Sequence, residues 1–423
     1  MVEEINDGEE IIIDSEEEII NEVEIDANEV IKSISLNLDD EDIKELKPKK
    51  KNKVAVEIIE RTSDDTEVLA KELYSEFASF LENKADIVED KGRKDTISTG
   101  IDLVDAILGG GFAVGALNII VGQPGSGKSM LAIQTLGQGQ RQHAGKLIGG
   151  FLDSEEATTK LRLSNLGVRF PQIRPYADIT VEKVFKFIEG LCVFKNQKEI
   201  IETPSIIVWD SIANTLSQKE RETDDPNTVI GYKARLLSIL VPKYVAKCAQ
   251  HNICLLAVNQ LRDVINMGMF APAKDLKFMS ATKDMPGGNV LKFNAFQLVE
   301  MKVKTAISLT GTEKSENYGF EGIIVTVKCV KNKLFPPNVE VPIVGSFTTG
   351  FSNFWTNYNF LKQTKRLNAG AWNYLISLPE KKFRTKDAPS LYKSDSEFKN
   401  AFDKASTEAI KEEIIDKYNP DVE

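Results

Sequence analysis

Long apolar runs are missing from this chain of 423 residues. A membrane-spanning helix needs about 20 consecutive apolar residues, whereas the most apolar segments, 117–121 and 253–258, have the length of single strands. The first residues also lack the basic and then apolar pattern of a secretory leader. We therefore expect a protein of the cytoplasm that does not associate with membranes.

Cysteine is also scarce, with four residues: Cys192, Cys248, Cys254 and Cys329. Their spacing matches no zinc motif, and each lies within or beside an apolar run. The sequence therefore favours buried thiols in a reducing compartment over a metal site or disulfides.

Net positive charge is missing as well, since the formal net charge is −11. The charge is unevenly placed, however. Residues 1–47 hold 18 acidic and 3 basic side chains, a net of −15, so residues 48–423 carry a net of +4. The acidity belongs to an extension, and the mildly basic remainder is compatible with a polyanionic partner.

The first 95 residues are expected to form an extension and a helix. Residues 1–60 have the composition of a disordered, solvating segment, although their isoleucines leave a short binding segment open as an alternative. Within 61–95, an aspartate at 64 or 65 can cap a helix over 66–83, followed by a linker. The apolar side chains of that helix recur on one stripe: Val68, Leu69, Leu73, Phe77, Phe80 and Leu81.

Strands and helices alternate from 96 to 345, the pattern of a mostly parallel sheet with helices on both faces. The apolar runs predict strands at 117–121, 147–152, 205–209, 253–258, 295–303 and 322–330. Long helices are expected over 128–142, 156–166, 180–194 and 228–250. Residues 346–423 are expected to form a small C-terminal α+β domain with its own aromatic residues.

A glycine-rich stretch follows the first of these strands and opens the first helix. It fits the pattern G-x-x-x-x-G-K-[ST], whose backbone N–H groups cradle phosphates at a helix N-terminus. Lys128 is expected to reach the β- and γ-phosphates of ATP, and the Ser129 hydroxyl to ligate Mg²⁺. The predicted site comprises Gly122, Gln123, Pro124, Gly125, Ser126, Gly127, Lys128, Ser129 and Met130.

Three further strands end in polar residues, at the sheet edge where such folds bind ligands. Asp210 follows the strand 205–209 and suits the Mg²⁺ shell of a P-loop enzyme. Glu155 or Glu156 can orient the water that attacks ATP, or can instead cap the helix that follows. Gln260 can contact a γ-phosphate, and polar termination of a strand is the alternative.

These strand ends, in this order, resemble those of the RecA recombinases. Four further stretches make the match to this family more specific. They are residues 95–105, Gly-Gly-Asn-Val-Leu-Lys-Phe at 287–293, Val-Lys-Asn-Lys with Phe-Pro at 330–336, and Ala-Gly-Ala-Trp at 369–372. In its connection lengths and in Leu-Ser-Gln-Lys-Glu at 216–220, the chain is more similar to phage UvsX-type recombinases. The likeness to the family runs from about residue 64 to residue 378. It leans towards a bacteriophage source.

The resemblance implies roles for residues at the nucleotide. Glu155 matches the residue that activates water, and Gln260 the γ-phosphate sensor. Arg162 stands where an adenine-stacking tyrosine is expected, and an arginine plane can also stack on a purine. Val344 stands where a second tyrosine flanks the base, and Gly345 is assigned to the same site.

The resemblance also implies an interface between subunits. Lys331 and Lys333 match lysines that reach a neighbour's ATP, and Phe293 matches an interface aromatic. The helix 66–83, with Leu73 and Phe77, corresponds to the arm that docks on the adjacent subunit.

Two segments are expected to face DNA, as loops near 217–229 and 261–289. The second includes 26 residues, 261–286, without a strong pattern, and loops of that length are usually functional or disordered. Its cations alternate with Met and Phe side chains that can wedge between bases; a flexible surface loop with incidental lysines is the alternative. The residues assigned to DNA, in part through the resemblance, are Lys219, Arg221, Arg235, Ser238, Arg262, Phe270, Lys274, Lys277, Lys283, Gly287, Gly288 and Asn289.

The sequence therefore predicts an α/β fold: a RecA-type P-loop ATPase core, an N-terminal interface helix and a small C-terminal α+β domain. The expected protein is a DNA-dependent ATPase that uses ATP and Mg²⁺. It would form a helical homo-oligomeric filament on single-stranded DNA and pair it with homologous double-stranded DNA. Mediator and single-strand-binding proteins are candidate partners. The alternatives are a RecA-fold helicase or translocase and a regulatory DNA-sensing ATP-binding protein; a Lys-x-Lys pair in place of an arginine finger favours the recombinase.

Overall fold

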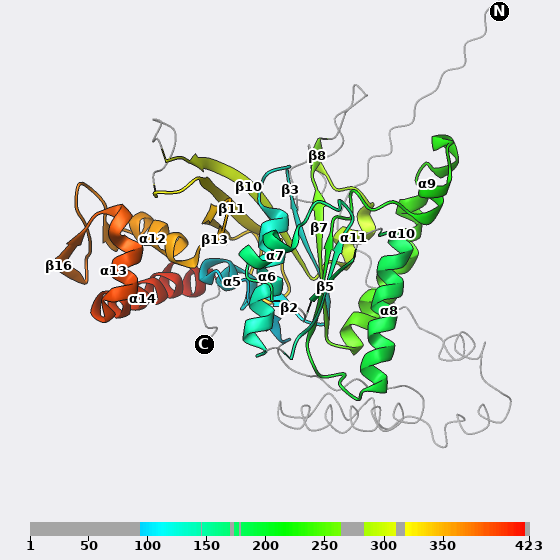
Figure 1. Cartoon of the computed structure of the whole chain (residues 1–423), viewed down its shortest axis with the longest axis horizontal. Coiled ribbons are helices and arrows are strands. Elements are labelled where there is room, and N and C mark those ends of the chain that lie inside the picture. Colours follow the sequence, from blue (N-terminus) through cyan, green and yellow to red (C-terminus); the bar gives the residue numbers. More distant parts are fainter. Residues whose placement is uncertain are drawn as a thin grey trace, which may run out of the picture. The chain divides into compact units, whose positions relative to one another are not determined.

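The computed structural model describes residues 94–144, 146–169, 173–176, 179–263, 283–309 and 318–418. These residues belong to one compact unit, Lys91–Glu423, whose described parts are coloured in Figure 1. The acidic extension 1–60 and the helix expected over 66–83 lie outside the described residues, so both stay predictions.

A sheet of nine strands forms the centre of the described chain, in the order β13-β12-β11-β10-β3-β7-β6-β4-β5. The strands from β10 to β5 run parallel, and β11, β12 and β13 extend the sheet in antiparallel fashion. The predicted mostly parallel sheet is therefore confirmed. The strand bounds are β3 (Ala116–Gly122), β4 (Ile148–Asp153), β5 (Ile173–Tyr176), β6 (Ser205–Asp210), β7 (Ile253–Gln260), β10 (Gln297–Ile307), β11 (Gly322–Lys331), β12 (Glu340–Ser346) and β13 (Gly350–Phe351).

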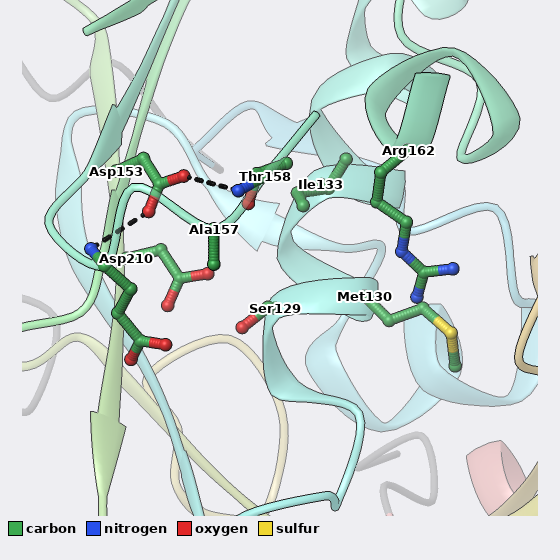
Figure 2. A pocket seen from close by; sticks show the side chains of 9 residues that line it. Ser129, Met130, Ile133, Asp153, Ala157, Thr158, Arg162 and Asp210 are labelled. Atoms are coloured by element: carbon green, nitrogen blue, oxygen red, sulfur yellow. Dashed lines mark hydrogen bonds between the residues drawn. The ribbon is translucent and has the colours of Figure 1, made fainter. Parts of the chain in front are cut away.

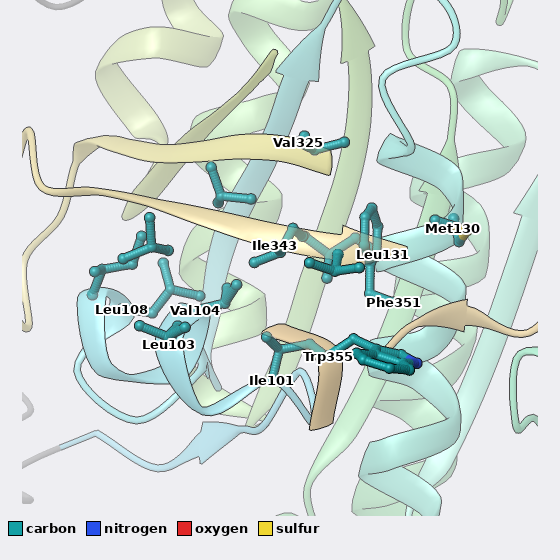
Figure 3. Close-up of a cluster of buried hydrophobic side chains, with 14 of the residues drawn as sticks. Ile101, Leu103, Val104, Leu108, Met130, Leu131, Val325, Ile343, Phe351 and Trp355 are labelled. Atoms are coloured by element: carbon teal, nitrogen blue, oxygen red, sulfur yellow. The ribbon is translucent and has the colours of Figure 1, made fainter. Parts of the chain in front are cut away.

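Helices cover both faces of this sheet (Figure 1). Successive strand side chains point to opposite faces, and in β3 Ile120 joins one apolar core while Ile119 and Val121 join the other. The first core, part of which Figure 3 shows, includes side chains of α5 (Asp102–Leu108), α6 (Lys128–Gln142) and α7 (Lys160–Asn165). The second includes side chains of α8 (Val181–Gln197), α10 (Tyr232–Gln250) and α11 (Asn289–Asn294).

The C-terminal residues pack onto the first core, to which Trp355, Phe398 and Phe402 belong. The amide N–H of Val344 in β12 donates to Thr356 Oγ1 at 3.0 Å, which joins the sheet to the next helix. The boundary expected at 345/346 stays a prediction. The elements are α12 (Asn353–Gln363), β14 (Leu367–Asn368), β15 (Asn373–Leu375), β16 (Leu378–Phe383), α13 (Ala388–Ser394), α14 (Ser396–Ile410), a π-helical turn (Lys411–Ile415) and α15 (Asp416–Tyr418).

Several expected elements differ in extent or kind; the helix expected over 228–250, for example, begins at Tyr232. The helix expected from 156 begins at Lys160, because Asp153 holds a turn by accepting the N–H groups of Glu155 at 3.1 Å and Thr158 at 3.0 Å. The first expected DNA loop contains α9 (Gln218–Glu222) and a 3₁₀ turn (Pro226–Val229). A capping box starts α9, since Ser217 Oγ accepts the N–H of Glu220 and Glu220 Oε2 accepts the N–H of Ser217.

Short strands complete the described part: β1 (Thr96–Ile97), β2 (Phe112–Ala113), β8 (Arg262–Asp263) and β9 (Lys283–Asp284). All four cysteines are free and buried, which confirms the prediction of buried thiols. None of the helices in the described part combines the length and apolar character that crossing a bilayer requires.

Candidate nucleotide site

The glycine-rich loop turns from β3 into α6. At Gly122 a Cβ would lie 2.4 Å from the carbonyl oxygen of Met301, so no side chain fits there. Gly125 and Gly127 have φ angles of +75° and +83°, which residues with a Cβ rarely adopt. The loop therefore needs its glycines, and it presents its backbone at the N-terminus of a long helix, where anions bind.

Lys128, at the first position of α6, is only 8% exposed. Its Nζ donates to the carbonyl oxygen of Gln123 at 2.8 Å and so lies across the loop. Burial lowers the pKa of this ammonium, while the Asp210 and Glu155 carboxylates act to raise it. A cation held there between two acids is suited to a polyphosphate entering the loop.

Asp210 ends β6 and is 5% exposed. Burial raises its pKa to about 6, and a hydrogen bond with the Ser129 side chain acts in the opposite direction. A hydroxyl oxygen and a carboxylate side by side are ligand types that Mg²⁺ accepts, together with waters and substrate phosphates. This donor set fits a magnesium ion bound with a nucleotide.

Glu155 follows β4 and lines a pocket that Ser129 and Asp210 also line, whereas Glu156 is not among the residues that line it. The Oε1 atom of Glu155 accepts hydrogen bonds from Asn214 Nδ2 and, at 3.4 Å, from Ser211 Oγ. The pairing of Asp153 with Asp210 in the parallel β4–β6 register brings these residues together. Sequence reasoning missed Asn214 because it lies 59 residues from Glu155 and outside any motif.

Gln260 lies beside the start of the phosphate loop, since the β3–β7 register pairs it with Gly122. The preceding residue, Asn259, is fully buried. Its Oδ1 accepts the N–H of Gln260 at 2.9 Å, and its Nδ2 donates to the carbonyl of Pro286 at 2.8 Å. Asn259, which sequence reasoning also missed, therefore ties this strand end to the point where the second expected DNA segment returns.

A pocket of about 360 Å³ opens beside these groups. Figure 2 shows Asp153 and Asp210 on one side of it, Met130 and Arg162 on the other, and Ser129 between them. Arg162 is held in place because its Nη1 donates to the carbonyl oxygen of Phe347. The pocket thus has an acidic end suited to metal and phosphates, and an end with a flat cation suited to a base.

The other two positions that the resemblance relates to the base, Val344 and Gly345, are not among the residues that line this pocket. Val344 is fully buried in the first core. Gly345 lies under the pocket wall: a Cβ there would come within 2.7 Å of the Phe351 ring and 3.0 Å of Met130 Cε. Gly345 therefore lets Met130 and Phe351 pack closely.

Comparison with known proteins places this chain in a family. A model described as the RecA N-terminal domain matches residues 84–352. The chain belongs to the RecA family. It is 27% identical over 285 residues to Protein RecA of Borrelia hermsii, which covers 66% of this chain and 72% of that protein. It is 29% identical over 283 residues to Protein RecA of Rippkaea orientalis (66% and 73%), and 29% identical over 261 residues to that of Thermus thermophilus (62% and 69%).

In this RecA-family chain, the expected interface residues gather at the end of α11. Phe293 is 74% exposed. Lys331 Nζ donates to the carbonyl oxygens of Lys292 at 2.9 Å and Phe293 at 2.8 Å, where a cation complements the helix C-terminus. Lys333 Nζ lies 5.5 Å from the centre of the Phe296 ring. An exposed aromatic beside two lysines is compatible with a subunit contact, and the assignment stays a prediction.

The expected DNA residues lie on α9, on α10 and around the second segment. Lys219 Nζ stands 5.1 Å from the centre of the Tyr232 ring. The side chains of Arg235 and Ser238 are exposed on α10, where Ser238 Oγ donates to the carbonyl of Arg235 at 2.6 Å. Arg221 lies on α9 beside Lys219.

The second segment leaves and rejoins the described chain as a short antiparallel ribbon. In its backbone register, position 262 lies opposite position 284, and position 263 lies opposite position 283. Gly287 and Gly288 follow with φ angles of +101° and +82°, and Asn289 opens α11. Phe270, Lys274 and Lys277 lie outside the described residues, as do Leu73 and Phe77.

Proposed function

We propose that this RecA-family chain is an ATP-dependent recombinase that forms a helical filament on single-stranded DNA and pairs it with homologous duplex. The observation that carries the ATPase assignment is the convergence of Ser129, Asp210 and Glu155 on one pocket. Lys128, directly before Ser129, feels the charges of both Asp210 and Glu155. Family membership and the relatives named RecA support the recombination assignment. The finer likeness to phage UvsX-type recombinases remains a prediction from sequence.

The proposed reaction is the in-line transfer of the γ-phosphoryl group to water. Lys128 would leave the Gln123 carbonyl and pair with the β- and γ-phosphates. Ser129 and Asp210 would hold Mg²⁺, which when bound neutralises charge on the phosphates. Glu155 is anchored through Oε1 by Asn214 and would accept the proton of the attacking water at Oε2.

Coupling to DNA is proposed to run through the end of β7. Gln260 would contact the γ-phosphate beside Gly122. A movement of Gln260 would be passed through Asn259 to Pro286, because Asn259 hydrogen-bonds both. The second DNA segment, anchored at that residue, would then respond to the nucleotide.

We assign Lys331 and Lys333 to the ATP of the adjoining subunit, so each active site takes residues from two chains. A Lys331→Ala protein should lose DNA-stimulated hydrolysis, and so should a Lys128→Ala protein, because each lacks half of every site. In a mixture, a junction between an intact P-loop and an intact Lys331 is whole, so hydrolysis should partly recover. Absence of recovery in mixtures that co-assemble on DNA would refute the assignment across the interface.

Electron microscopy with single-stranded DNA and a non-hydrolysable ATP analogue tests the proposed assembly. The recombinase predicts continuous helical filaments that depend on the nucleotide. Rings would instead indicate the helicase or translocase, and bound but unassembled subunits the regulatory DNA sensor.

A further inference from the structure

Three lysines lie near the C-terminal end of α11, two of them over the ring of Phe296. Lys94 Nζ and Lys333 Nζ each lie 5.5 Å from the centre of that ring. Lys331 Nζ donates hydrogen bonds to the carbonyls of Lys292 and Phe293, which lie in the last turn of α11 and precede Phe296. Lys94 precedes β1, so no sequence motif connects it with the other two lysines.

These three cations lack a counter-charge within the described part of the chain. The described acceptors of Lys94 Nζ are backbone carbonyls, those of Gly115 at 3.1 Å and Val114 at 3.5 Å. Burial and then repulsion from Lys333 lower the pKa of both Lys94 and Lys331. Like charges brought together in a partly desolvated place destabilise one another, and a bound anion relieves that repulsion.

We propose that Lys94 is the third cation of a polyphosphate site, formed with Lys331 and Lys333, that takes the ATP of the adjoining subunit. The inference rests on the proposed function, because it extends the two lysines assigned across the interface. Triphosphate oxygens offer charge-assisted hydrogen bonds to more than two ammonium groups. Phe293, exposed beside the site, supplies apolar surface for the neighbouring chain.

A nucleotide suits this place better than a DNA strand does. The glycines assigned to DNA open α11 at its N-terminus, whereas the lysine cluster surrounds its C-terminus. Two cations over one ring and a third at the adjoining helix end form a compact target, whereas cations that follow a DNA backbone are spread along a groove. Contact with DNA is therefore an outcome that would contradict the proposal.

Mixed filaments can show on which side of the junction Lys94 acts. The Lys128→Ala subunit supplies the lysines of the active junction, and the Lys331→Ala subunit supplies its P-loop. Lys94→Ala added to the Lys128→Ala subunit should raise the ATP concentration for half-maximal hydrolysis about tenfold, as expected for one lost bond to a charged group. The same change in the Lys331→Ala subunit should have no effect. Lys186→Ala, an exposed lysine on α8, is the matched control in both placements.

An equal effect in both placements, or none in either, overturns the proposal for Lys94 while leaving the Lys331 assignment intact. Failure of the parent mixture to recover activity, although its subunits co-assemble on DNA, contradicts the proposed assignment of Lys331 and Lys333 across the interface, and this site with it. Lys94→Gln keeps a donor for the Gly115 carbonyl but loses the charge, so it should behave like Lys94→Ala if charge matters. Wild-type behaviour of Lys94→Gln would mean that Lys94 only joins β1 to the turn before β3. A salt slope for single-strand binding reduced by about 0.7 would make Lys94 a DNA contact and also overturn the proposal.

Discussion

At the scale of single residues, neighbours set the roles of the two glutamates that follow β4. Asp153 holds the turn through the N–H groups of Glu155 and Thr158. Glu155 is then fixed by Asn214 and Ser211 on the pocket wall. Glu156 has a φ angle of 52° and does not line the pocket. Residue type and position alone left the choice between them open, whereas the family resemblance pointed to Glu155, which this geometry also favours.

Glu155→Gln should retain ATP and DNA binding but lose turnover, because an amide cannot accept the proton of the attacking water. The expected loss in the DNA-stimulated rate is about 10² to 10⁴-fold. Glu156→Gln is the matched control and should hydrolyse ATP at nearly the wild-type rate. A Glu155→Gln protein of normal rate would move the role to another group.

At the scale of elements, the sequence predicted the parallel strands and the long helices well, because unbroken apolar runs and helical spacing mark them directly. The helix expected over 128–142 agrees with α6. Residues held by distant partners could not be found this way. The start of α7 depends on Asp153, and α11 is a helix of six residues between a glycine pair and β10. Asn214 and Lys94 became site candidates only through contacts that the fold creates.

Lys195 joins three elements at the opposite end of the sheet from the pocket. It is fully buried on α8, and its Nζ donates to Thr203 O at 2.6 Å, Ser205 Oγ at 3.2 Å and the carbonyl of His251. Its acceptors thus lie beside the starts of β6 and β7. Burial lowers the pKa of this lysine to about 8, whereas an unfolded chain gives about 10.4.

This pKa shift predicts a pH dependence of stability. Between about pH 8 and 10.4 the unfolded chain binds more protons than the folded one, so Lys195 makes the free energy of unfolding rise with pH, by at most about 1.4 kcal/mol per unit. Urea unfolding across that range should show a steeper rise for wild type than for Lys195→Met. Lys198→Met, at an exposed lysine after α8, should follow wild type. Parallel curves for wild type and Lys195→Met would show that Lys195 stays charged in the folded protein.

The second DNA segment carries a separate prediction, motivated by its lysines and by its anchor at Pro286. Replacing Lys274, Lys277 and Lys283 together by Ala should flatten the salt dependence of single-strand binding. Each lost phosphate contact reduces the log–log slope by about 0.7. An unchanged slope, with ATP binding intact, would assign the segment another role.

At the scale of the whole molecule, charge is divided between an acidic extension and a weakly basic remainder. The net of −15 on residues 1–47, against +4 on the rest, can compete with DNA for cationic surface at low ionic strength. Deleting residues 1–60 should therefore leave ATPase activity intact and tighten single-strand binding at low salt, with the difference fading as salt is raised. Weaker binding after deletion would point to the lysines at 47–53 as the dominant element.

In the proposed recombinase, ATP binding at this pocket supports recombination rather than translocation or sensing. The most direct test is the formation of joint molecules between a single strand and homologous duplex DNA. The proposed recombinase should form joint molecules that need ATP, form with homologous but not heterologous duplex, and disappear in the Lys128→Ala protein. A wild-type protein that coats single strands and hydrolyses ATP, yet forms no joint molecules with homologous duplex, would contradict this proposal.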